Sequence, residues 1–230
     1  MSFDLPSANN GALISATQRN QVLRQTYTLL AASMVPTIIG AALGLFLGLG
    51  QLLRGSPIIG MVVFLAGAFG LMYMVQKNST SSKGVAWLMA FTFFMGLMLS
   101  QILSRTLGFK NGPEMIMLAF GGTAAIFAAM ATVAGMIKRD LSGFGKFLMI
   151  GAVVLLVASI GGVFLQIPAL SLTIVVGILI LSSAFLMYDL NQIMQGGETN
   201  YISATLGVYM NIYNIFSALL SLLGLGGSRE

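Results

Sequence analysis

The chain has 230 residues, of which 57% are hydrophobic and only 7% are charged, and its formal net charge is +5. Soluble domains carry about 25% charged residues, so the composition excludes an ordinary water-soluble protein and indicates a lipid bilayer as the main solvent. The sequence contains no cysteine and no histidine, which excludes disulfides, thiolate metal sites and histidine-based catalysis. Its basic residues are scattered through the connectors, so no nucleic-acid partner is expected.

Seven apolar runs follow one another along the chain, and each is close to the roughly 20 residues that a helix needs to cross a bilayer. The expected spans are 25–50, 57–75, 84–103, 114–137, 147–165, 170–188 and 201–225. The sixth helix is expected to continue to Gln195, because its first breaker is Gly196. Barrel strands would be about 10 residues long and would alternate, unlike these runs. The predicted fold is therefore all-α, a polytopic transmembrane bundle of seven helices in a single domain at 25–225.

Two polar tails flank this predicted domain, residues 1–24 and residues 226–230. The first contains Pro6 and Gly11 and lacks the basic and then apolar pattern of a signal peptide, so we expect it to be disordered. The end of the bundle with the N-terminus carries seven basic residues and the other end four: Arg19, Arg24, Lys77, Lys83, Lys138, Arg139 and Lys146 against Arg54, Arg105, Lys110 and Arg229. Positively charged loops stay in the cytoplasm, so the prediction is a cytoplasmic N-terminus and a periplasmic or external C-terminus.

Three glycines in the first span, Gly40, Gly44 and Gly48, repeat at intervals of four residues. This small-xxx-small spacing allows two helices to approach closely. A seven-helix bundle has many internal contacts to make, so we expect the glycines to pack inside the protein rather than to form a dimer.

Asp189 differs from the other five acidic residues, because it lies inside a predicted span. The others lie in tails, in loops or at a helix start: Asp4, Glu114, Asp140, Glu198 and Glu230. If the sixth helix ends at Gln195, Asp189 is about 9 Å from that end. A carboxylate within the membrane costs roughly 2.5 to 3.5 kcal/mol at mid-depth, so it normally faces a bundle interior or water.

The last span supplies polar neighbours at a comparable depth, namely Tyr209, Asn211, Tyr213 and Asn214 at i, i+3 and i, i+4 spacings. A polar cluster could therefore form around Asp189. Two interpretations remain open, a hydrogen-bonded network that holds two helices together and a site that senses ions or protons. An aspartyl protease would need a second facing carboxylate, which Asn211 does not provide, so we expect neither an enzyme nor a cofactor.

The most informative motifs lie in the last third of the chain: Tyr188-Asp189, GGETNYISAT at 196–205 with the loop residues Gly196, Gly197 and Glu198, and YMNIYNIFSALLSLLG at 209–224. LAFGGTA at 118–124, FLQIPAL at 164–170 and VLRQTY at 22–27 support them. On these residues the chain resembles the Bax inhibitor-1 family of seven-helix membrane proteins, in particular its bacterial YccA-like branch. The resemblance covers nearly the whole chain.

This resemblance implies a bacterial inner-membrane bundle in which six helices surround the seventh. YccA-like members associate with the membrane AAA protease FtsH and restrain it, and a tail such as residues 1–24 is what the protease would grip. Other members look like pH-sensitive Ca²⁺ leak channels with two buried aspartates and an arginine on helix two. Here Asp189 matches the first aspartate, Asn211 replaces the second, and 57–75 contains no Arg. The resemblance therefore implies FtsH modulation, and the alternative is a pH-dependent leak of Ca²⁺, H⁺ or another cation that is gated by Asp189.

Overall fold

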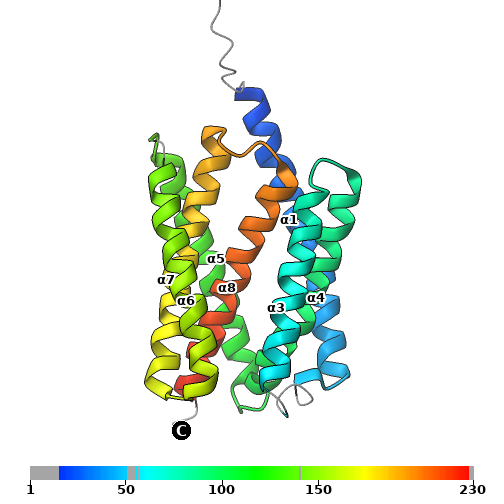
Figure 1. Cartoon of the computed structure of the whole chain (residues 1–230), viewed down its shortest axis with the longest axis vertical. Helices are drawn as coiled ribbons and strands as arrows, with labels where there is room; N and C mark the ends of the chain where they lie inside the picture. Colours follow the sequence, from blue (N-terminus) through cyan, green and yellow to red (C-terminus); the bar gives the residue numbers. More distant parts are fainter. Residues whose placement is uncertain (1–15, 51–54, 56, 140, 228–230) are drawn as a thin grey trace, which may run out of the picture.

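The computed structural model of the chain describes residues 16–50, 55, 57–139 and 141–227. Within these residues it consists of long helices without a strand (Figure 1): α1 (Ala16–Phe46), α3 (Pro57–Lys77), α4 (Ser82–Thr106), α5 (Gly112–Met136), α6 (Ser142–Leu165), α7 (Pro168–Gln195) and α8 (Tyr201–Gly227). All seven are long and apolar enough to cross a membrane. The predicted all-α transmembrane bundle of seven helices is thus confirmed.

The largest difference from the predicted boundaries is at the start of α1, which begins at Ala16 rather than at residue 25. Residues 16–24 are polar but contain neither glycine nor proline, so nothing interrupts the helix where the hydropathy falls. The expectation of disorder is wrong for this part of the tail, and residues 1–15 lie outside the described residues. With 31 residues, α1 is about 46 Å long, well over the roughly 30 Å of a bilayer core.

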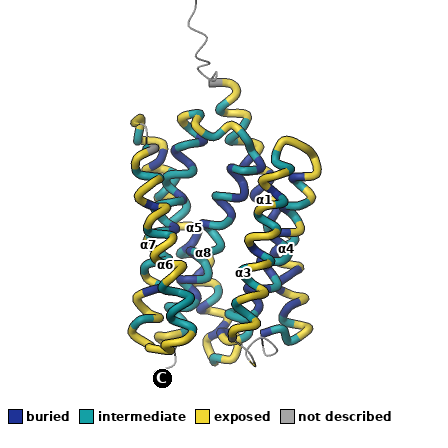
Figure 2. The backbone as a smooth tube through the Cα atoms, in the orientation of Figure 1, coloured by how far each residue is buried: buried dark blue, intermediate teal, exposed yellow. Residues whose placement is uncertain are grey.

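The last helix, α8, occupies the middle of the bundle and packs against α1, α3, α4, α5 and α7. Its buried stretch is visible along the centre of the molecule, whereas the outer helices α3 and α6 have few buried residues (Figure 2). The family resemblance implies that all six other helices surround α8. The structure differs in one helix, because α6 packs mainly against α7. This arrangement places α7 and α8 side by side, as any contact with Asp189 requires.

Glycines allow helices α1 and α4 to approach each other closely. A Cβ atom on Gly40 would collide with the Phe93 carbonyl oxygen, and one on Gly44 would lie 2.5 Å from Ser100 Oγ. The structure therefore places these two residues against α4, inside the bundle. Gly48 differs from the prediction, because nothing lies within 4 Å of its Cβ position and its φ is +65°. It follows the end of α1 in a left-handed conformation that favours glycine.

The outer surface of the bundle is strongly apolar. Phe120 on α5 and Phe147 on α6 are 71% and 70% exposed, and they are two of many large hydrophobic side chains that point outward. A surface of this kind is not stable in water but matches the hydrocarbon core of a bilayer. The exposure pattern therefore agrees with the lipid environment that the composition predicts.

Candidate intramembrane carboxylate site

Asp189 lies fewer than two turns before Gln195, the last residue of α7. Gly196 ends the helix as predicted, with a left-handed φ of 80°. The following backbone turns back onto the helix, since the N–H groups of Gly197 and Glu198 donate to the Gln192 carbonyl oxygen over 2.8 and 3.2 Å. This turn satisfies an end carbonyl of α7 and directs the chain into the connector to α8.

The carboxylate of Asp189 contacts α8 directly. Asn211 Nδ2 donates a hydrogen bond of 2.7 Å to Asp189 Oδ2. A Cβ atom on Gly207 would lie only 2.9 Å from the same oxygen, so the missing side chain at Gly207 makes room for the carboxylate. Gly207 and Asn211 are four residues apart and therefore lie on one face of α8, one providing space and the other a donor.

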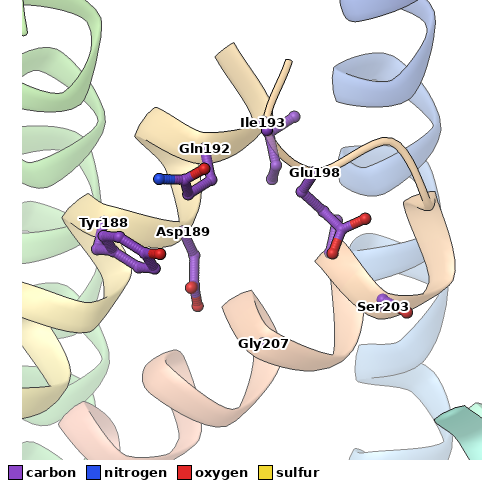
Figure 3. A pocket seen from close by; sticks show the side chains of 9 residues that line it. Tyr188, Asp189, Gln192, Ile193, Glu198, Ser203 and Gly207 are labelled. Atoms are coloured by element: carbon purple, nitrogen blue, oxygen red, sulfur yellow. The ribbon is translucent and has the colours of Figure 1, made fainter. Parts of the chain in front are cut away.

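A pocket of about 200 Å³ extends from the α7–α8 connector to Asp189 (Figure 3). Its lining is Tyr188, Asp189, Gln192, Ile193, Gly197, Glu198, Ser203, Ala204 and Gly207. Two carboxylates, two hydroxyls and an amide give it the chemistry to accept a proton or a small hydrated cation. Among the described residues no three acidic side chains come together, so the pocket lacks the several carboxylates of a tight Ca²⁺ site.

The two predicted tyrosines take part in a different contact. The Tyr209 hydroxyl lies 2.8 Å from Thr37 Oγ1 on α1, and its ring packs edge-on against Phe91 on α4. Tyr213 stacks on Tyr209, with ring centroids 6.3 Å apart. Tyr209 therefore belongs to the junction of α1, α4 and α8, and Tyr213 is joined to Tyr209 by the ring stack rather than to the carboxylate.

Asn214 is half-buried, and no hydrogen bond of its side chain occurs within the part of the chain that the structure describes. Of the four α8 residues predicted to surround Asp189, hydrogen bonding thus joins only Asn211 to it. The site is a pair of residues next to a pocket rather than the extended cluster that the sequence predicts.

Asn200 is a structural residue of the site that the sequence analysis missed. Its Oδ1 accepts hydrogen bonds from the N–H groups of Ile202 and Ser203, over 2.9 and 3.1 Å, and so caps the start of α8. Its Nδ2 donates to the Ser79 carbonyl oxygen, over 2.9 Å, in the α3–α4 connector. An asparagine directly before an apolar run is a known start signal, so its position in the GGETNYISAT motif could have indicated this role.

We expect Asn200→Ala to lower the stability of the protein by about 1 kcal/mol, because the first turn of α8 loses its cap. Hydrogen exchange at the backbone amides of Ile202 and Ser203 should become faster. Thr199→Ala is the control, since Thr199 is exposed and precedes Asn200 directly. Equal exchange rates in the two variants would show that the cap is without effect.

Helix α7 is also fixed to the C-terminal end of α5 by amide side chains. Asn191 Nδ2 donates to the carbonyl oxygens of Ala134 and Ile137, over 3.1 and 2.7 Å, and Gln195 Nε2 donates to that of Ile137 over 3.0 Å. These hydrogen bonds satisfy carbonyl groups at the end of α5 that have no donor within the helix. They hold the part of α7 that carries Asp189 in a defined position.

Fold and site together define a polytopic helical membrane protein with a carboxylate, Asp189, inside its bundle. A family model described as "Inhibitor of apoptosis-promoting Bax1" matches residues 19–228. The chain therefore belongs to the Bax inhibitor-1 family, in agreement with the resemblance carried by its motifs.

Several bacterial proteins are similar to the chain over most of their length. An uncharacterized protein of Neisseria meningitidis is 40% identical over 89% of this chain and 91% of its own. The protein of Escherichia coli K12 named "Modulator of FtsH protease YccA" is 37% identical over 91% of this chain and 92% of its own. The same identity and coverage hold for a second Escherichia coli strain, where the protein is named "Inner membrane protein YccA".

Proposed function

We propose that this protein modulates the membrane protease FtsH in a bacterial inner membrane. The observation that carries the proposal is the 37% identity to the Escherichia coli modulator, which extends over 91% of this chain and 92% of that relative. The protein acts by binding rather than by catalysis. Its partners are the lipid bilayer and the protease.

The distribution of charge supports an N-terminus on the cytoplasmic side. The helices alternate in direction (Figure 1), so one end of the bundle carries Arg19, Arg24, Lys77, Lys83, Lys138, Arg139 and Lys146, whereas the described basic residues at the other end are Arg105 and Lys110. The more basic end belongs in the cytoplasm. The start of α1 and the Asp189 pocket then share the cytoplasmic side, and the C-terminus is periplasmic.

The test is co-purification of FtsH with the protein from native membranes, for the full chain and for a variant without residues 2–15. This deletion stops before Ala16 and so preserves α1 and the 3.4 Å bond from Arg19 Nη1 to the Met194 carbonyl oxygen. We expect the full chain to retain FtsH and to slow proteolysis of a membrane substrate, and the shortened chain to lose the second effect.

A matched control replaces residues 2–15 by an unrelated polar sequence of the same length. If the protease grips any accessible tail, this control should behave as the full chain does. Absence of FtsH from the full-length preparation would refute the proposal.

A second candidate function is a pH-dependent leak of H⁺ or Ca²⁺ that is controlled by Asp189. The pocket that reaches Asp189 from the connector favours it, because an intramembrane carboxylate beside a polar pocket is a common element of ion pathways. Asp189 is paired with an amide, and Glu198 is the only other carboxylate in the lining of the pocket, so the site favours H⁺ over Ca²⁺. Protease modulation does not require a titrating side chain, so substitution of Asp189 separates the two functions.

A further inference from the structure

A second hollow lies at the same end of the bundle as the start of α1. It is a groove of about 630 Å³ between α1, α4 and α8, and it shares no lining residue with the Asp189 pocket. Its polar lining consists of Gln21, Arg24, Gln25, Thr28 and Tyr201, and its apolar lining of Leu29, Ala32 and Val85. The groove therefore has two chemically different parts.

Arg24 gives the polar part its charge. It is the one charged residue among the lining residues, its side chain is exposed, and it forms no ion pair within the described residues. A guanidinium group presents paired N–H donors that match the oxygens of a phosphate. With no acidic side chain in the lining to neutralise it, Arg24 is suited to an anionic ligand.

The polar part of the groove lies near the end of the bundle, and the apolar part lies deeper, towards the middle of the bilayer. Arg24 shares the groove with Tyr201, the first residue of α8, and with Val85 in the first turn of α4. These residues lie at the polar, basic end of the bundle, near Lys77 and Lys83, where the apolar runs of the helices give way to polar residues and lipid phosphates are expected. Leu29 and Ala32 are one and two turns further along α1, towards the hydrocarbon core.

We propose that this groove binds one anionic phospholipid, with its phosphate on Arg24 and the start of an acyl chain along Leu29, Ala32 and Val85. Basic pockets between transmembrane helices are a known mode of headgroup recognition. The order of charge, polar donors and apolar surface along the groove matches the order of phosphate, glycerol and chain in a lipid. This site depends neither on the protease nor on Asp189.

The test uses the full-length protein, freed of lipid in detergent and titrated with phosphatidylglycerol or phosphatidylcholine, with bound lipid counted by native mass spectrometry. We expect one phosphatidylglycerol to bind more tightly than phosphatidylcholine. Arg24→Gln should weaken the binding of phosphatidylglycerol about tenfold. The control is Lys83→Gln, which removes the same charge at the same end of the bundle but outside the groove, and which should bind as the native chain does.

A second variant, Ala32→Phe, fills the apolar part and leaves Arg24 in place. This variant should also weaken the binding of phosphatidylglycerol, because the phenylalanine ring occupies the place of the acyl chain. Circular dichroism verifies that its fold is intact. Equal losses in Arg24→Gln and Lys83→Gln would reveal only general attraction to a basic surface and would overturn the proposal. Unchanged binding by Ala32→Phe, with loss in Arg24→Gln, would indicate a phosphate site without a lipid chain and would overturn it too.

Discussion

Replacement of Gly96 by alanine is expected to destabilise the protein by about 1 to 3 kcal/mol, a large effect for a single methyl group. A Cβ atom on Gly96 of α4 would collide with the Thr37 carbonyl oxygen of α1. Because the obstacle is backbone and not a flexible side chain, the two helices must move apart. The hydroxyl of Thr37 also lies 2.8 Å from the Tyr209 hydroxyl on α8, so a displacement of α1 would disturb the contact with α8 as well.

The measurement is unfolding in increasing mole fractions of SDS, followed by circular dichroism. Gly40→Ala should behave like Gly96→Ala, since its Cβ would collide with the Phe93 carbonyl oxygen in the same interface. Gly70→Ala is the matched control, because nothing lies within 4 Å of its Cβ position on α3. It should be neutral or stabilising by about 0.5 to 1 kcal/mol, the ordinary gain from replacing a helical glycine. Equal stability of Gly96→Ala and Gly70→Ala would contradict the close approach of α1 and α4.

The number and type of the helices were predictable from the sequence, because a bilayer demands about 20 apolar residues for each crossing. The end of α7 was predictable as well, since Gly196 is its first breaker. The start of α1 was not. Hydropathy marks where a helix leaves the lipid, whereas helical hydrogen bonding can continue beyond that point, here past Arg24 as far as Ala16, the first described residue.

The site was predictable in part. The predicted spans place Asp189 and Asn211 at a similar depth in the membrane, and in the structure a hydrogen bond connects their side chains. Depth does not specify the direction in which a side chain points. At 3.6 residues per turn, Tyr209 and Asn211 are about 200° apart around α8, so they cannot both face α7.

The same angular argument separates Tyr213 from Asn211, and it explains why Tyr213 stacks on Tyr209. Gly207, one turn before Asn211, was the missing signal for the face of α8 that receives the carboxylate. A glycine there is informative only once the partner helix is known, and the sequence does not specify the neighbours of α8. This is why the pair could be predicted and its surroundings could not.

Substitution of Asp189 by asparagine should abolish the pH dependence of any ion flux through this protein. The pocket reaches Asp189 from the connector, the chain has no histidine to titrate in its place, and the other carboxylate of the pocket, Glu198, lies in the connector rather than inside a helix. Deprotonation puts a charge beside Asn211, which can donate a hydrogen bond but cannot neutralise it, so hydration of the pocket becomes favourable. Flux should therefore rise with pH in the native chain, by at most about tenfold per pH unit, because one carboxylate binds one proton.

In liposomes that contain an H⁺- or Ca²⁺-sensitive dye, Asp189→Asn should show a constant flux at the low level that the native chain reaches in acid. The fold should persist, since an amide can still bond to Asn211. Glu198→Gln is the matched control, because it makes the same carboxylate-to-amide change in the lining of the same pocket and should retain the pH dependence. A flux from Asp189→Asn that still rises with pH would remove Asp189 from the mechanism, and the pair with Asn211 would then serve only to hold α7 against α8.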